Sequence, residues 1–265
     1  MSELHTLKIH NSYSLDEAWK NLEEAGFQIA YGEEENGIIL LHLFLRSDEK
    51  LPTFPWIIAC QKSELPLIDW DSQWAQHGLN FNNGLLTISL CDYERNIPAF
   101  FLKPGPGFGD LSHPTTHLTL KLLCKHLKNE KVIDIGCGSG ILTVAAVKMG
   151  ASFAYGLDID EAALKHSSEN AILNKIDNLC CFKFPNNFDL KSQEPVIILM
   201  NMISSEQIIA WDSLPSLHTL KGLLLISGIS LSEKNSYLRQ ARLRGWKLKD
   251  ELEQNEWLGF SFALS

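Results

Sequence analysis

A nine-residue segment near the middle of the chain constrains the fold more than any other. Residues 132–140 are Val-Ile-Asp-Ile-Gly-Cys-Gly-Ser-Gly, an apolar run that ends in an acid and a glycine-rich turn, and the mainly apolar residues 141–147 follow. This order predicts a buried parallel strand, a tight loop and the start of a helix. Glycines let the loop turn sharply and approach a ligand closely, and the free N–H groups of a helix start favour electron-rich groups.

A dinucleotide-binding loop is the nearest alternative. Its fingerprint, Gly-x-Gly-x-x-Gly, requires a glycine at the sixth position, which is Ile141 when counted from Gly136. The segment instead has the pattern Asp-x-Gly-x-Gly-x-Gly, which resembles motif I of the class I S-adenosylmethionine (AdoMet) methyltransferases. A second apolar run, 153–157, ends in Asp158, and an acid at that point can accept hydrogen bonds from both hydroxyls of a ribose. A glycine loop with helix-capping acids in another α/β fold is the remaining alternative.

The whole chain has the composition of an ordinary globular protein, with 265 residues and a net charge of −9. This charge disfavours nucleic acids and anionic membranes, so we expect neither as a partner. The six cysteines form no Cys-x-x-Cys pair and no zinc-site spacing, and we therefore expect no metal. Residues 1–10 lack the pattern of a signal peptide and no apolar run could span a bilayer, so we expect a cytoplasmic protein.

The first part of the chain predicts a small α+β module. Residues 4–10 alternate as in a strand, and Ser14 with Glu17 forms a capping box that opens a helix. Two further runs, 27–31 and 38–45, predict a hairpin whose turn carries residues 33–37. Another strand is expected at 56–60. Residues 1–70 hold twelve acids and five bases, a net charge of −7, which indicates either a solvated acidic surface or a docking module for a basic partner.

Strands and helices alternate from residue 131 onward, which predicts a parallel sheet covered by helices on both faces. The expected strands are 132–135, 153–157, 179–182, 196–200, 223–227, 246–248 and 257–264, and the expected helices are about 140–149, 160–174, 205–220 and 231–244. In such sheets, ligands bind beyond the carboxyl ends of the strands at the topological switch point. Three strand ends carry suitable groups, namely the glycine loop, Asp158 and Asn201.

The segments around these strand ends resemble one family, the ribosomal protein L11 methyltransferases (PrmA). The resemblance extends from about Trp70 to the C-terminus and rests on residues 109–116 (Gly-Asp-Leu-Ser-His-Pro-Thr-Thr), 132–140, 156–160, Asn201 and 227–229. It implies a class I methyltransferase fold, an α/β Rossmann-like seven-stranded sheet with a small N-terminal α+β domain. It also implies that residues matching Thr116, Gly136, Asp158 and Asn201 bind AdoMet. We therefore expect the cofactor at Thr116, Gly136, Cys137, Gly138, Gly140, Asp158, Ile159 and Asn201.

Two departures from the family pattern concern the site. Residues 110–112 are Asp-Leu-Ser where the family has Thr-Gly-Thr, and residues 201–203 are Asn-Met-Ile where the family has Asn-Ile-Leu. The N-terminal module also lacks a second helix of the family's substrate domain. The resemblance implies a substrate-docking domain at 1–66 (truncated ferredoxin-like), a linker with connecting strands at 67–110, and an AdoMet-binding methyltransferase domain at 111–265.

The reaction that the resemblance implies is methylation of lysine and N-terminal amines of a ribosomal protein. A sulfonium methyl is already activated, so the enzyme needs mainly to align a neutral amine, and Asn201 is the expected catalytic residue because its side-chain carbonyl can accept a hydrogen bond. The chain has no Asn-Pro-Pro-aromatic element, which argues against base and glutamine substrates. His113 and His117 lie one turn apart, but without a third ligand we do not expect them to bind a metal, and we expect His113 to fix its loop by hydrogen bonding. A small-molecule methyltransferase and a degenerate AdoMet-binding protein remain as alternatives.

Overall fold

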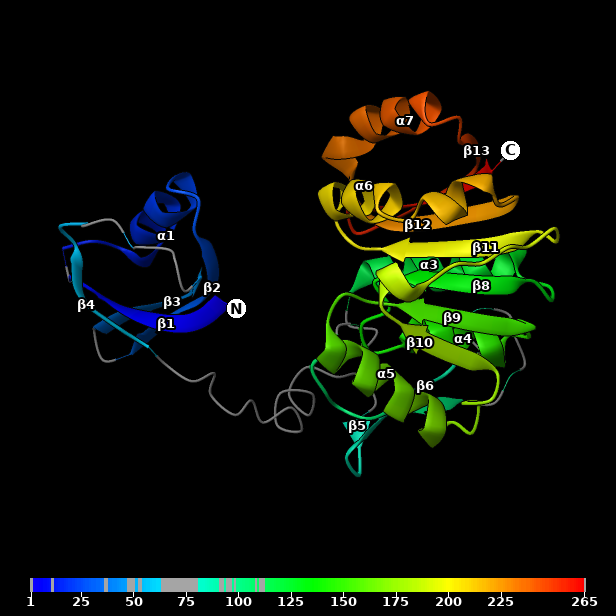
Figure 1. Ribbon diagram of the computed structural model, residues 1–265, viewed down its shortest axis with the longest axis horizontal. Helices are drawn as coiled ribbons and strands as arrows, with labels where there is room; N and C mark the ends of the chain where they lie inside the picture. Colours follow the sequence, from blue (N-terminus) through cyan, green and yellow to red (C-terminus); the bar gives the residue numbers. More distant parts are fainter. Residues whose placement is uncertain are drawn as a thin grey trace. The chain divides into compact units, whose positions relative to one another are not determined.

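The protein divides into two compact units, Met1–Ile68 and Asp69–Ser265, as seen in a computed structural model (Figure 1). The structure describes residues 2–10, 12–35, 38–46, 51, 54–62, 81–90, 93, 97, 99–107, 109 and 113–264. Asn36, Gly37 and the altered segment 110–112 lie outside these described residues, as do Trp70 and residues 67–80 of the expected linker. None of the helices in the described ranges has the length and apolar character needed to cross a membrane.

The first unit is an antiparallel sheet with one helix, within the residues that the structure describes. Its elements are β1 (Ser2–Ile9), α1 (Leu15–Glu24), β2 (Gln28–Glu35), β3 (Ile38–Arg46) and β4 (Ile57–Lys62), and the strand order is β2-β3-β1-β4. No helix occurs among the described residues between β3 and β4. The β-α-β-β order agrees with the sequence-based expectation.

A capping box and an apolar helix face explain why α1 forms and where it packs. The Ser14 N–H donates to Glu17 Oε2 over 3.0 Å, and the Glu17 N–H donates to Ser14 Oγ over 3.2 Å. These two bonds satisfy N–H groups that a helix start leaves without partners. Ala18 and Leu22 are fully buried on the face of α1 that packs in the core of this unit. The core therefore fixes the helix on the sheet, and the capping box fixes where the helix begins.

The expected hairpin is present, but its turn is shorter than the sequence suggested. β2 continues to Glu35, which pairs with Ile38 of β3, so the acidic residues 33–35 lie in the strand and not in the turn. Only residues 36 and 37 stand between the two strands. Hydrogen bonds between β2 and β3 favour the longer strands, because they satisfy backbone groups that a longer loop would leave to water. Connections of two residues are also common in hairpins.

The second unit contains a seven-stranded sheet in the described part of the chain. Its strands are β8 (Lys131–Ile135), β9 (Phe153–Leu157), β10 (Cys180–Lys183), β11 (Val196–Asn201), β12 (Gly222–Ser230), β13 (Lys247–Gln254) and β14 (Trp257–Leu264). The order is β10-β9-β8-β11-β12-β14-β13, and every neighbouring pair is parallel except the two pairs that contain β14. The chain passes to the other side of β8 when it reaches β11. The carboxyl ends of β8, β9 and β11 therefore meet at the switch point, where the sequence predicts the site.

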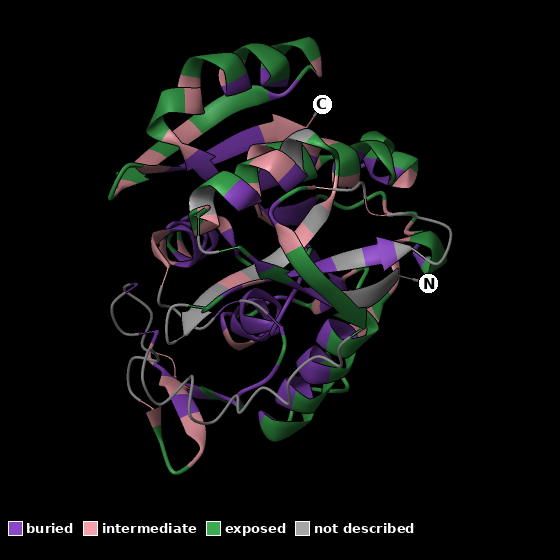
Figure 2. Cartoon of the chain, turned by 90° about the vertical axis from the view of Figure 1, so that its left-hand side faces the viewer, coloured by how far each residue is buried: buried purple, intermediate pink, exposed green. Residues whose placement is uncertain are grey.

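Two hydrophobic cores lie on opposite faces of this sheet. The helices of the second unit are α3 (Pro114–His126), α4 (Ile141–Lys148), α5 (Glu161–Leu173), α6 (Ser204–Asp212) and α7 (Lys234–Leu243). Val132 belongs to the core under α3, α4 and α5, whereas Ile133 belongs to the core under α6 and α7. In Figure 2 the outer faces of the helices are coloured as exposed, while residues coloured as buried lie on the faces that turn toward the strands. This two-sided burial explains why the central strands β8, β11 and β12 are almost continuously apolar.

Two sequence-based expectations about the second unit need correction or addition. The helix expected at 205–220 ends at Asp212, and a separate 3₁₀ helix, Pro215–Thr219, follows, because a proline cannot donate the hydrogen bond that a continuing helix requires. The connecting strands expected within residues 67–110 form a small sheet with order β5-β6-β7, from β5 (Phe81–Asn82), β6 (Leu85–Ile88) and β7 (Phe100–Leu102). β7 contacts α4 and α5, so these strands belong to the second unit.

Candidate active site

The glycine loop forms a sharp left-handed turn between β8 and α4. Gly136, Gly138 and Gly140 have φ angles of 72°, 53° and 79°, which residues with a side chain rarely adopt. The N–H groups of Gly136 and Cys137 both donate to the carbonyl of Leu157, at 2.8 and 3.0 Å. These bonds tie the loop to the end of β9, so the glycine loop and the acidic segment that follows β9 form one structure.

A second loop packs against the glycine loop from outside. A Cβ atom on Gly107 would overlap backbone atoms of Gly138 and Ser139, so the two backbones are in direct contact. The Ser139 hydroxyl donates to the carbonyl of Gly109 over 2.6 Å, and the Gly107 N–H donates to His166 Nδ1 over 3.1 Å. The described residues of segment 103–109, which we call the strap, therefore hold the glycine loop in place.

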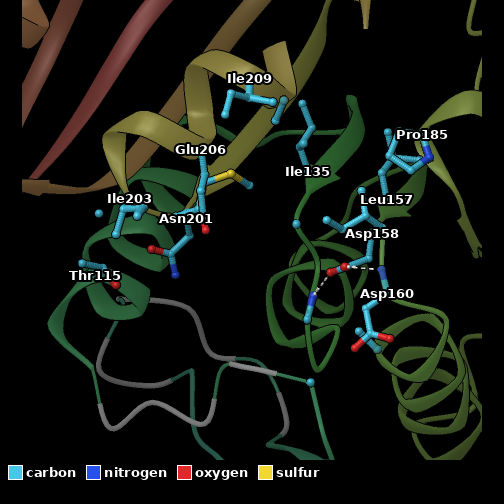
Figure 3. Close-up of a pocket in the computed structure, with 18 of the residues that line it drawn as sticks. Thr115, Ile135, Leu157, Asp158, Asp160, Pro185, Asn201, Ile203, Glu206 and Ile209 are labelled. Carbon is cyan, nitrogen blue, oxygen red and sulfur yellow. Dashed lines mark hydrogen bonds between the residues drawn. The ribbon is translucent and has the colours of Figure 1, made fainter. Parts of the chain in front are cut away.

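A cavity of about 840 Å³ opens at the carboxyl ends of β8, β9 and β11 (Figure 3). Figure 3 shows Asn201, Glu206 and Ile209 on one side of it and Leu157, Asp158 and Pro185 on the other. A volume of this size is typical of small-molecule sites. The cavity lies at the switch point of the sheet, where the sequence predicts the site.

Asp158 accepts two backbone hydrogen bonds at the edge of the cavity. The Gly138 N–H donates to its Oδ2 over 2.9 Å, and the Asp160 N–H donates to its Oδ1 over 3.0 Å. Each carboxylate oxygen can accept a further hydrogen bond, so the side chain is oriented and still able to bind ligand hydroxyls. The neighbouring Ile159 is 86% exposed and offers an apolar surface beside it. This arrangement suits a ribose with a planar apolar group next to it.

Asp134 is a buried acid directly behind the glycine loop. Its Oδ2 accepts a hydrogen bond from the Thr143 hydroxyl over 2.7 Å, whereas its Oδ1 has no partner in the part of the chain that the structure describes. Burial raises the pKa of Asp134 to about 7, and the nearby negative charge of Asp158 acts in the same direction. A positively charged ligand in the cavity would favour the ionised form of this acid.

Asn201 is the last residue of β11, and its side chain points into the cavity (Figure 3). Its Nδ2 donates to the hydroxyl of Thr116 over 3.3 Å, and this bond leaves the side-chain carbonyl oxygen available to accept from a ligand. Thr116 itself is fully buried in the first turn of α3. The bond between them connects the helix after the strap with the end of the fourth parallel strand.

The structure brings only part of the expected cofactor set to the cavity surface. The expected residues that line the cavity are Gly136, Gly138, Asp158, Ile159 and Asn201, and those that do not are Thr116, Cys137 and Gly140. The last three residues are buried and support the lining from behind. Burial also raises the pKa of the Cys137 thiol well above its usual range, so this residue is no reactive thiolate.

Several lining residues were missed by the sequence analysis, among them Thr115, Pro185, Met202, Glu206 and Trp257. Thr115 and Met202 adjoin residues that were singled out, so closer attention to neighbours would have found them. Trp257 begins β14, and its position depends on the insertion of that strand beside β12. No local signal in the sequence identifies such a contribution.

Both histidines near the start of α3 form hydrogen bonds, which the sequence predicted for His113. His113 caps α3, and its Nδ1 lies 2.8 Å from the Thr115 hydroxyl. His117 Nδ1 lies 2.6 Å from the Tyr93 hydroxyl. Among the residues that the structure describes, no three His, Cys, Asp or Glu side chains are grouped so that they could hold a metal ion.

The buried acid gives a testable dependence of stability on pH. From about pH 4, the usual pKa of an aspartate, to about pH 7, the folded protein keeps a proton on Asp134 that the unfolded chain releases, so this residue lowers stability as the pH rises. Asp134→Asn cannot ionise. In thermal unfolding without ligand, we expect the difference in melting temperature between Asp134→Asn and wild type to shift in favour of the variant from pH 5 to pH 8. Asp189→Asn, at an exposed position, is the control, and an unchanged difference would contradict the assignment.

Comparisons with known proteins agree with this architecture. A family model described as ribosomal protein L11 methyltransferase (PrmA) matches residues 45–264. A ribosomal protein L11 methyltransferase of Thermotoga petrophila is 30% identical over 245 residues, 90% of either chain. One from Thermotoga neapolitana is 28% identical over 260 residues, 95% of this chain and 94% of the other.

A solved structure shows the same fold. The crystal structure of a ribosomal protein L11 methylase from Lactobacillus delbrueckii subsp. bulgaricus covers 68% of this chain and 98% of its own, with a TM-score of 0.55 and 23% identity. The family match covers most of the chain, and the seven-stranded sheet is that of the class I methyltransferases. The chain therefore belongs to the ribosomal protein L11 methyltransferase (PrmA) family and is an AdoMet-dependent protein methyltransferase.

Proposed function

We propose that this enzyme methylates amine groups of ribosomal protein L11, on lysine side chains and at the N-terminus. The observation that carries the proposal is a cavity lined by the glycine loop, Asp158 and Asn201, which offers room for a cofactor beside an amine acceptor. The substrate is inferred from the names of the relatives, which are ribosomal protein L11 methyltransferases.

The residues around the cavity suit AdoMet as the methyl donor. Gly136 and Gly138 leave room for close approach, and the start of α4 favours a carboxylate. Asp158 could accept hydrogen bonds from both ribose hydroxyls, and the exposed Ile159 would offer an apolar surface to the adenine. When Asp134 is ionised, its unpartnered Oδ1 behind the loop adds negative potential, which suits a ligand that carries positive groups.

Asn201 is the residue that we assign to the reacting amine. AdoMet, when bound, supplies a methyl group on a sulfonium, which is already activated for transfer. A lysine amine has an unperturbed pKa of about 10.4 and must lose a proton before it can react. The side-chain carbonyl of Asn201 can then accept a hydrogen bond from the neutral amine and hold its lone pair in line, because Nδ2 is already bonded to Thr116.

The first unit is the proposed docking site for the protein substrate. Residues 1–70 carry a net charge of −7, whereas the whole chain carries −9, so most of the excess negative charge lies in this part. An acidic surface suits a basic protein and speeds its association. We also infer that the enzyme works in the cytoplasm, because Cys60, Cys137, Cys180 and Cys181 are free thiols, as expected in a reducing compartment.

Transfer to a ribosomal protein is the direct test of the function. Purified enzyme with labelled AdoMet and a ribosomal protein extract should label one protein band, and digestion should locate the label on amines. Asn201→Ala should lower the rate at saturating AdoMet by about tenfold or more, because the amine loses its acceptor. A label found only in an extractable metabolite, or none at all, would contradict the proposal.

The cofactor assignment is tested at Asp158. Asp158→Ala should weaken AdoMet binding by about ten- to a hundredfold in calorimetry, since hydrogen bonds to a charged acceptor contribute about 1.5–3 kcal/mol. Asp158→Asn keeps an acceptor oxygen and should show a smaller loss. Equal affinity in all three proteins would remove Asp158 from the cofactor site.

The docking proposal is tested by neutralising the acids of β2. A variant with glutamine at residues 33–35 should raise KM for the protein substrate and leave AdoMet affinity unchanged. The effect should shrink at high salt, because the Debye length falls from about 10 Å at 0.1 M to about 3 Å at 1 M. Glutamine at Glu194, Glu253 and Glu256, which are exposed in the second unit, is the matched control. If both triple variants behave alike, the acids of β2 have no special role in docking.

A further inference from the structure

A buried glutamine makes three hydrogen bonds directly behind the cavity. Gln207 lies on α6 and is 1% exposed. Its Nε2 donates to the carbonyl of Met202 over 2.6 Å and to the carbonyl of Ser227 over 2.9 Å, and its Oε1 accepts from the Tyr237 hydroxyl over 2.5 Å. A side-chain amide offers two donor hydrogens and one acceptor oxygen, so these partners satisfy both hydrogens and fix which way the amide points.

The two carbonyls that Gln207 binds stand on either side of Asn201. Met202 follows Asn201 in the chain, and Ser227 is the residue paired with Asn201 on the neighbouring strand β12. A Cβ atom on Gly228 would overlap the Met202 carbonyl, so the absence of a side chain there lets this carbonyl come close to β12. One amide group therefore ties the connection after β11 to the adjacent strand at the level of Asn201.

Tyr237 holds the amide from the other side. It lies on α7, is 5% exposed, and its ring stacks on Phe260 at a centroid distance of 6.0 Å. Burial raises the pKa of its hydroxyl well above the usual range, so the group remains a hydrogen-bond donor. Rotation of the Gln207 amide would place its N–H groups against this donor and its oxygen against a carbonyl. The chain of contacts from α7 through α6 to the end of β11 thus has one favourable arrangement.

We propose that Gln207, oriented by Tyr237, is a positioning residue for Asn201 that holds the backbone after β11 so that the Asn201 carbonyl faces the reacting amine. The inference rests on the role given to Asn201 in the proposed function. It adds that Gln207, a residue outside the cavity lining, fixes the orientation of Asn201.

Measuring kcat distinguishes a positioning role of Gln207 from a role in the stability of the fold alone. Gln207→Leu removes all three bonds, and Tyr237→Phe removes only the hydroxyl, so the second variant serves if the first does not fold. At saturating AdoMet and protein substrate we expect kcat to fall about tenfold in Gln207→Leu and about threefold in Tyr237→Phe, while Kd for AdoMet changes by less than about twofold. Gln240→Glu, an exposed position on α7, is the control and should match wild type.

The NMR signal of the Met202 methyl group reports the structure after β11 in the absence of substrate and cofactor. The chain has four methionines, and the methyl group of Met202 lies so close to Gly136 that a Cβ atom there would overlap it. In spectra of protein labelled with ¹³C at the methionine methyl groups, both variants should shift the Met202 signal. The signal of Met149, at the far end of α4, should stay in place. A purely structural role would lower the melting temperature without moving the Met202 signal of the folded protein.

The two measurements distinguish a failure of this inference from a failure of the proposed function. An unmoved Met202 signal overturns the inference even when the enzyme is active. A kcat within about twofold of wild type in both variants overturns it as well, whatever the signal does. Wild-type protein that transfers no methyl group overturns the proposed function itself. A shifted signal together with a lower kcat and an unchanged Kd for AdoMet supports the assignment of Gln207.

Discussion

Two backbone segments pack against each other with no side chain between them, and the rest of the site depends on this contact. Gly107 lies directly against the peptide that joins Gly138 and Ser139. β8 turns into α4 through glycines in left-handed conformations, and such a loop has few side chains of its own that could fix its shape. The shape is instead fixed from outside, by the strap on one side and by the Leu157 carbonyl on the other. The order of the glycine loop thus depends on these two neighbouring segments.

Buried side-chain amides are the recurring means by which this unit holds its loops. Asn170 of α5 accepts from the N–H of Lys103 in the strap and donates to the carbonyl of Ser139 in the glycine loop. Gln207 does the equivalent at the ends of β11 and β12. An amide bonded in this way satisfies backbone groups of two segments at once, and a buried group left unsatisfied costs about 1–3 kcal/mol. The same bonds that make these loops stable therefore also fix their relative positions.

The local part of this site could be predicted from the sequence, and the long-range part could not. The glycine loop, Asp158 and Asn201 each follow an apolar run, so periodicity alone places them at strand ends. His166 holds the strap across 59 positions of the chain, and its helical pattern gives no sign of that contact. Strand order likewise decides that Trp257 reaches the cavity. The alternation of strands and helices predicted the fold class, while a single proline shortened one expected helix.

Met202, where the chain departs from the family pattern, has a flexible side chain on a backbone that is held in place. The family has isoleucine where this chain has Met202, and the longer, unbranched side chain reaches across to Gly136 on the neighbouring strand end. A thioether side chain changes rotamer easily and adapts to irregular surfaces, so it can withdraw when a ligand approaches the glycine. The backbone of the same residue does not share this freedom, because its carbonyl is bonded to Gln207. The side chain of Met202 can therefore adapt while its backbone, next to Asn201, stays fixed.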